Sequence, residues 1–137
     1  MISAGEQAPD FTLPDQGGQE VSLSDFKGQR VLLVFYPLDF SPVCSDQLTL
    51  YRDIAPQLKE AGVTPLGISV DSAFAHKAFQ DHLGIDTTLL ADFEPKGAVA
   101  SAYGAYLDGA GHSNRSLVLI DADGKVEWVH ETATPLD

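Results

Sequence analysis

The residue of this sequence best suited to nucleophilic chemistry is Cys44, the only cysteine among 137 residues. It follows the apolar run from Val31 to Tyr36 and precedes an amphipathic segment at 45–61. This pattern predicts a sulfur placed where a buried strand gives way to a helix. A helix N-terminus offers unpaired N–H groups and the positive end of the helix dipole, and both favour a thiolate. The alternative is an inert, buried side chain, which is the usual role of a free cysteine.

A reactive Cys44 needs a nearby cation, because Asp39 and Asp46 are close in sequence and oppose a negative charge on sulfur. Only eight residues are lysine or arginine. Arg115 stands out among them because it opens the apolar segment 116–120. An arginine at a strand edge can equally extend into solvent or form a surface ion pair, so its position alone leaves both interpretations open.

Composition excludes several classes of protein. The formal net charge of −12 repels nucleic-acid phosphates and anionic membranes, so we expect neither as a partner. A single cysteine allows no intramolecular disulfide and no multi-cysteine zinc site. Residues 1–7 lack the basic and apolar regions of a signal peptide, and the longest apolar run is too short to span a membrane. We therefore expect one domain over residues 1–137, in a reducing cytoplasmic setting.

The pattern of apolar and turn-forming residues predicts an α/β fold. Short edge strands are expected at 8–14 and 20–23, with a helical turn at 24–28. Buried strands are expected at 30–36, 63–70 and 116–120, with shorter strands at 87–90 and 125–130. Helices are expected at about 43–61, at 73–83 and from 92–95 to 102, and a loop at 103–114.

This order of elements predicts a three-layer sandwich with a central mixed sheet, an N-terminal β-ribbon and a C-terminal β-hairpin. In such sheets the reactive crevice lies beyond the carboxyl ends of the central strands. The segment from Pro37 to Cys44 is expected at that edge.

Pro37, Ser41 and Cys44 follow the spacing Pro-x-x-x-Ser-x-x-Cys, and Arg115 follows much later in the chain. This set resembles the peroxiredoxin active site, which has Pro-x-x-x-Thr/Ser-x-x-Cys and an arginine from a later strand. The resemblance implies a thioredoxin-like fold and covers nearly the whole chain, including segments 8–11, 31–36, 67–71 and 114–121. Segments 96–104 and 110–115 look most like the one-cysteine alkyl hydroperoxide reductase E branch. The bacterioferritin-comigratory branch is the next closest.

The resemblance implies a role for each residue of the pattern. The Cys44 thiolate would attack one oxygen of a peroxide, expel the other and become a sulfenic acid. Arg115 would stabilise the thiolate and donate hydrogen bonds to the peroxide. The Ser41 hydroxyl and the N–H groups of Val43 and Cys44 would donate to the same oxygens, and Pro37 would shield the sulfur from water. No cofactor or metal is expected.

Three positions depart from the family pattern. Ser41 replaces the commoner threonine and Gln47 a common glutamate, and we expect activity to survive both changes. Thr49 stands where the comigratory branch often has a resolving cysteine. The resemblance therefore implies a one-cysteine mechanism, in which a low-molecular-weight thiol or a thioredoxin- or glutaredoxin-like protein reduces the sulfenic acid. The family's final helix is not evident before 135–137, so it is either absent or missing from this sequence.

Other interpretations share some of these features. A redox sensor or relay would also be oxidised at Cys44 and would pass on that state by a mixed disulfide. A cysteine–histidine protease lacks its local signature, and a thioredoxin-type oxidoreductase would need a cysteine at Ser41. His76 and His82 are expected in surface or internally satisfied roles, and His112 as a bystander near the pocket.

Three aromatic side chains near the expected site are interpreted as core or pocket wall: Phe40, Phe93 and Tyr103. The family resemblance also implies a homodimer formed through loops near the active site. The same aromatic residues are candidates for that contact.

Overall fold

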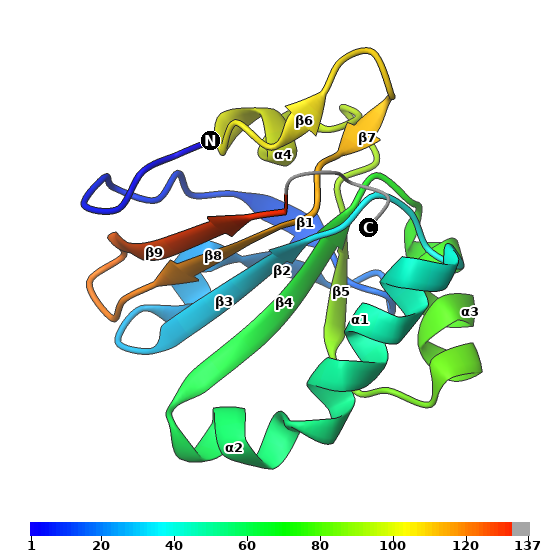
Figure 1. Ribbon diagram of the computed structural model, residues 1–137, viewed down its shortest axis with the longest axis horizontal. Coiled ribbons are helices and arrows are strands. Elements are labelled where there is room, and N and C mark those ends of the chain that lie inside the picture. The colour runs from blue at the N-terminus through cyan, green and yellow to red at the C-terminus, as the bar shows by residue number, and fades with distance from the viewer. Residues whose placement is uncertain (133–137) are drawn as a thin grey trace.

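The structure is a computed structural model that describes residues 1–132, and it is built around a five-stranded sheet (Figure 1). The strand order is β5–β4–β3–β8–β9. The strands span β3 (Arg30–Phe35), β4 (Val63–Ser69), β5 (Thr88–Ala91), β8 (Ser116–Ile120) and β9 (Val126–Glu131). β3, β4 and β5 are parallel, whereas β8 is antiparallel to β3 and to β9. The predicted mixed sheet is confirmed.

Helices cover one face of this sheet. They are α1 (Pro42–Asp53), α2 (Ala55–Glu60) and α3 (Ala73–Leu83). Leu48 and Tyr51 from α1 pack with Phe79 from α3 in one buried cluster on this face. The prediction of one helix over 43–61 is wrong. The helix is interrupted at Ile54, and a second helix, α2, begins with Pro56 in its first turn. A proline cannot donate the hydrogen bond that a continuous helix would need there.

The opposite face is covered by the N-terminal ribbon and a short helix (Figure 1). The ribbon pairs β1 (Thr12–Pro14) with β2 (Glu20–Ser22) and continues into the 3-10 helix η1 (Leu23–Phe26). The helix expected from 92–95 begins only at α4 (Ala98–Ala102). Its start is fixed by Asp92, whose carboxylate accepts hydrogen bonds from the N–H groups of α4.

The predicted loop at 103–114 contains a small hairpin of β6 (Tyr106–Leu107) and β7 (His112–Ser113). Strands of two residues are too short to show a period in the sequence. The possible final helix near 135–137 lies outside the described residues. Within residues 1–132, no helix has both the length and the apolar character needed to cross a bilayer.

The sheet register places three distant segments at one edge. Phe35, the last residue of β3, is paired with Ile68 of β4 and with Ser116 of β8. The residues that follow β3 and β4 and those that precede β8 therefore meet at this edge. It is the edge at which the sequence predicted the reactive crevice.

Candidate active site

Cys44 lies in the first turn of α1, three residues after the N-cap residue Ser41. Its side chain is a free thiol with 0% of its surface exposed. It belongs to the buried cluster that also contains Tyr36, Leu48 and Phe79. The helix therefore directs the sulfur toward the sheet.

Hydrogen-bond donors gather at the start of α1 beside this sulfur. The Ser41 side chain makes no capping bond, and its buried Oγ has no hydrogen-bond partner within residues 1–132. The first bond recorded across this turn runs from the Ser45 N–H to the Ser41 carbonyl, at 2.9 Å. Pro42 has no N–H, so Val43 and Cys44 supply the first-turn N–H groups that find no acceptor inside the helix. The hydroxyl and these N–H groups are suited to an oxygen-rich ligand.

Arg115 reaches the same helix from the other end of the chain. It directly precedes β8, and only 6% of it is exposed. Its Nη1 donates a hydrogen bond to Gln47 Oε1 at 2.7 Å. Gln47 follows Cys44 by three residues, and residues at this spacing share a helix face. The structure thus ties the arginine to α1 one turn beyond the sulfur, and Pro37 is buried at the start of the same loop.

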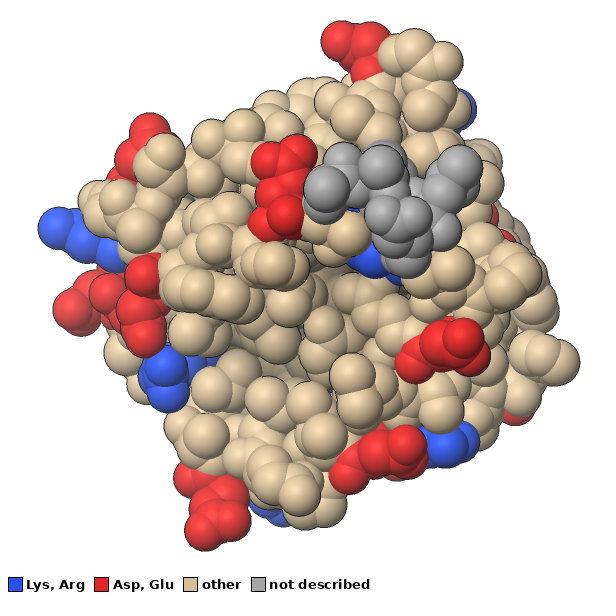
Figure 2. Space-filling view, viewed as in Figure 1, with Lys and Arg blue, Asp and Glu red and all other residues tan. Residues whose placement is uncertain are grey.

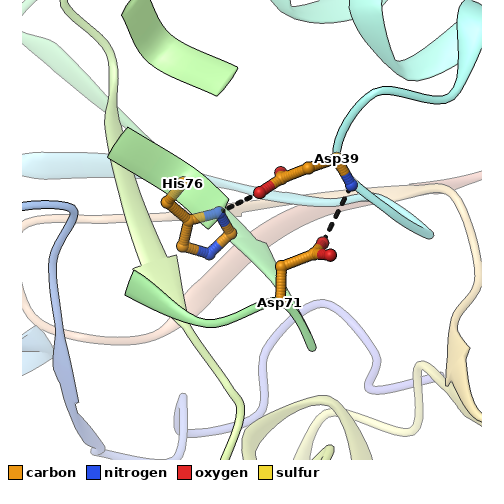
Figure 3. A group of neighbouring side chains, drawn as sticks. All are labelled: Asp39, Asp71 and His76. Atoms are coloured by element: carbon orange, nitrogen blue, oxygen red, sulfur yellow. Dashed lines mark hydrogen bonds and ion pairs between the residues drawn. The ribbon is translucent and has the colours of Figure 1, made fainter. Parts of the chain in front are cut away.

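A buried hydrogen-bond network anchors the loop between β3 and α1 (Figure 3). Asp39 accepts from the Tyr36 hydroxyl at 2.6 Å through Oδ1, and its Oδ2 lies 2.7 Å from His76 Nδ1. His76 Nε2 lies 2.9 Å from the Leu90 carbonyl oxygen. Burial, followed by the Asp39 charge, raises the pKa of Tyr36 well above its ordinary value, so its hydroxyl remains a donor.

The backbone of Asp39 is held as well. Its N–H donates to Asp71 Oδ2 at 2.8 Å, and the same oxygen accepts from the Ser69 hydroxyl at 2.5 Å. Asp39, Asp71 and His76 each offer one possible metal-ligand atom, and these atoms lie within 4.8 Å of one another. Their atoms are already engaged in the hydrogen bonds of the network, so we interpret the group as an anchor for the loop.

Phe40 shapes the turn between this anchor and α1. Its φ of 66° is in the left-handed region, which costs a non-glycine residue about 1–2 kcal/mol. Its ring, 51% exposed, packs on Phe79 at a centroid distance of 4.9 Å and on His82 at 5.7 Å. Aromatic contacts of this kind contribute about 0.5–1.5 kcal/mol each and offset much of the backbone cost.

This network was not predicted from the sequence. Asp39 was expected to oppose a thiolate, but its carboxylate is paired with His76. His76 has the internally satisfied role that was one of its two expected outcomes. The spacing of His76, Phe79 and Leu83 on α3 was a usable signal, because it places the histidine on the buried face.

The sequence matches the AhpC/TSA family over residues 4–129. The chain belongs to this peroxiredoxin family. It is 40% identical over 129 residues to alkyl hydroperoxide reductase E of Mycobacterium tuberculosis, covering 93% of this chain and 84% of that protein. It is 40% identical over 139 residues to peroxiredoxin Bcp of Escherichia coli, covering 95% and 86% of the two chains.

The fold agrees with this assignment. The crystal structure of peroxidoxin BcpB from Mycobacterium tuberculosis is similar, with a TM-score of 0.89 and 30% identity over 99% of this chain and 90% of that one. The peroxiredoxin resemblance and the thioredoxin-like α/β fold expected from the sequence are confirmed. As a peroxiredoxin, the protein is a thiol-dependent peroxidase whose reaction needs a peroxide and a thiol reductant.

The remaining sequence candidates separate into core and surface. Tyr103 is a core residue whose hydroxyl donates to the Pro9 carbonyl at 2.6 Å, so it cannot serve a dimer contact. Phe40 and Phe93 are about half exposed. His112 Nδ1 lies 2.8 Å from the carbonyl oxygen of the next residue, Ser113. On the face shown in Figure 2, acidic side chains are scattered and form no single cluster.

Proposed function

We propose that this peroxiredoxin reduces hydrogen peroxide and small organic hydroperoxides by a one-cysteine mechanism. The Cys44 thiolate attacks the terminal oxygen of the peroxide, the O–O bond breaks, and the other oxygen leaves as hydroxide or alkoxide and takes a proton. Cys44 is left as a sulfenic acid. Because the O–O bond is weak, the contribution of the protein is to align the substrate and to stabilise charge on the departing oxygen.

Different residues around the sulfur stabilise the thiolate, donate hydrogen bonds to the peroxide and exclude water. Arg115 stabilises the thiolate and donates to the peroxide oxygens. Ser41 and the first-turn N–H groups of Val43 and Cys44 donate to the same oxygens. Pro37, which is buried and has no N–H, shields the sulfur from water.

A second thiol must complete the cycle from outside the chain, because Cys44 is the only cysteine. Two equivalents of an external thiol reduce the sulfenic acid to the thiol, releasing water and a disulfide. We assign this role to a low-molecular-weight thiol or a thioredoxin- or glutaredoxin-like protein in a reducing, cytoplasmic compartment. The exposed rings of Phe40 and Phe93 beside the site are the candidates for a homodimer contact.

One observation carries this proposal: the hydrogen bond between Arg115 and Gln47. It ties a nearly buried cation to the face of α1 that carries Cys44. An arginine serving only as a surface ion pair would not be drawn inward to a neutral amide on that helix.

The test is the rate at which Cys44 gains one oxygen from peroxide, followed by rapid quenching and mass spectrometry. We expect the wild type to react far faster than a free thiol. Cys44→Ser should gain no oxygen, and Arg115→Ala should react about 10²–10³-fold more slowly, the usual cost of removing one donor to a developing oxyanion. Arg52→Ala is the control, since Arg52 also lies on α1 but its side chain is 44% exposed and contacts Asp53 and the Leu83 carbonyl oxygen.

The proposal fails if the wild type is oxidised no faster than a free thiol. Equal losses in Arg115→Ala and Arg52→Ala would remove Arg115 from the mechanism. Rapid oxidation without turnover by any thiol reductant would favour the redox sensor instead.

A further inference from the structure

The loop that leads into the active-site helix is held by α3 at two successive residues. His76 contacts the side chain of Asp39, and Phe79 and His82 contact the ring of Phe40 (Figure 3 for the first contact). Ser41, the N-cap residue of α1, comes next in the chain. Any displacement of Asp39 is therefore transmitted to Ser41 through a single intervening residue.

The hydrogen positions in the network follow from its acceptors. The Leu90 carbonyl can only accept, so His76 Nε2 carries a hydrogen. The 2.7 Å contact between His76 Nδ1 and Asp39 Oδ2 then requires a second hydrogen on one of these two atoms. Whichever atom holds it, the pair has no net charge. The pair therefore contributes geometry to the site and adds no charge that would oppose a thiolate at Cys44.

His76 is well placed to transmit rigidity. Its side chain is 0% exposed, and both ring nitrogens are engaged, one by the loop and one by β5. Tyr36, directly after β3, and Asp71, after β4, complete the set of contacts on Asp39. Hydrogen bonds thus hold the loop in place relative to three strands of the sheet and to α3.

We propose that His76 is a positioning residue for peroxide reduction. Through Asp39 it fixes the 37–41 loop so that the Ser41 hydroxyl and the first N–H groups of α1 converge on the bound peroxide. The proposal rests on the proposed function of Cys44, and it assigns to α3 a part in catalysis that the cysteine motif does not contain.

The test compares two reactions of Cys44 at one pH: oxidation by hydrogen peroxide and alkylation by iodoacetamide. Alkylation needs the thiolate and access to it, but it does not need donors aligned on an O–O bond. We expect His76→Leu and Asp39→Ala to lower the ratio of the peroxide rate constant to the alkylation rate constant at least about tenfold, because small misplacements of reacting groups cost rates of this order.

Asp39→Asn is the conservative variant that should preserve the ratio. Its amide oxygen can accept from Tyr36, and its amide N–H can donate to Nδ1 of a neutral His76, so each hydrogen bond is retained. We expect its ratio to remain within about threefold of the wild type, since positioning is kept. Leu13→Ala controls for lost stability, because Leu13 is buried on the opposite face of the sheet. Its ratio should equal that of the wild type at a temperature where all variants are folded.

An unchanged ratio in His76→Leu and Asp39→Ala overturns the proposal, as does an equal loss in Asp39→Asn and Asp39→Ala. If the two disruptive variants do not fold, Tyr36→Phe decides, since it removes a single hydroxyl from the network. A lowered ratio there supports the proposal, and a wild-type ratio overturns it. Failure of the peroxidase function is distinguishable, because it would be seen in the slow oxidation of the wild type itself.

Discussion

Gly67→Ala should destabilise the protein, although alanine is ordinarily the better residue in a strand. Gly67 lies in the interior strand β4. An added Cβ would stand 2.7 Å from Leu89 Cδ2 and 3.3 Å from Tyr36 Cε1. Carbon atoms prefer separations of about 3.5–4.0 Å, so the Leu89 methyl would have to move by about 1 Å. Leu89 is completely buried, and close-packed protein interiors offer little room for such a movement.

The magnitude follows from two opposing effects. Overpacking a buried site costs about 1–3 kcal/mol. Replacing glycine with alanine returns about 0.5–1 kcal/mol, because the unfolded chain loses freedom. The midpoints of these two ranges differ by about 1 kcal/mol, so we expect the free energy of unfolding to fall by about that amount in urea denaturation. The peroxide rate should fall as well, since the displaced Tyr36 ring carries the hydroxyl that anchors Asp39.

Gly109→Ala is the matched control, because a Cβ there meets no atom within 4 Å. It should change stability by no more than about 0.5 kcal/mol. Adding Leu89→Val to Gly67→Ala removes the colliding methyl, so the double variant should be more stable than the sum of the single changes by about 1 kcal/mol. Additive effects, or a Gly67→Ala variant as stable as the wild type, would refute this reasoning.

Further predictions concern the arginine contact, the start of α4 and a buried phenol. Gln47→Ala removes an acceptor of Arg115. Because hydrogen bonds to charged groups contribute about 1.5–3 kcal/mol, the peroxide rate should fall about 10- to 150-fold, and Gln47→Glu should restore it in the same rapid-quench assay. Asp92→Asn replaces one of the two acceptors of the α4 N–H groups with a donor, so urea denaturation should show a loss of about 1–3 kcal/mol. Burial raises the pKa of Tyr103 well above its ordinary value, so its contribution to stability is fully present below about pH 10 and is lost as the pH rises through the raised pKa. Above pH 10 this group should lower the free energy of unfolding by up to about 1.4 kcal/mol per pH unit, and Tyr103→Phe should remove that slope in guanidinium denaturation.

Local patterns were sufficient to predict most of the fold. β3 and β8 appear in the sequence as uninterrupted apolar segments, and this signal does not depend on which strands they pair with. The break before α2 was also within reach, because Pro56 interrupts a helix by a local rule. The apolar spacing continues across the break and concealed it.

The site was predictable only in part, because its contacts join residues that are distant in sequence. The motif around Cys44 is local, and it was visible in the sequence as the spacing of Pro37, Ser41 and Cys44. The partners of that motif are decided by tertiary packing: Arg115 meets Gln47 across 68 positions, and His76 meets Asp39 across 37. No rule of propensity or periodicity distinguishes a histidine that anchors a catalytic loop from one that fills a core.

Because the Cys44 sulfur is completely buried, its oxidation by peroxide and its later reduction by a thiol require movements of different size. A peroxide needs only a brief, side-chain-scale fluctuation to reach the sulfur. A reducing thiol must bring a second sulfur into line with the sulfenic acid, which requires the first turn of α1 to move away from the sheet. Turnover is therefore expected to approach a ceiling as the reductant concentration rises, set by how often that turn opens. The packing of one helix turn, and not the chemistry of the reducing thiol, then limits how fast the sulfenic acid is reduced back to the thiol.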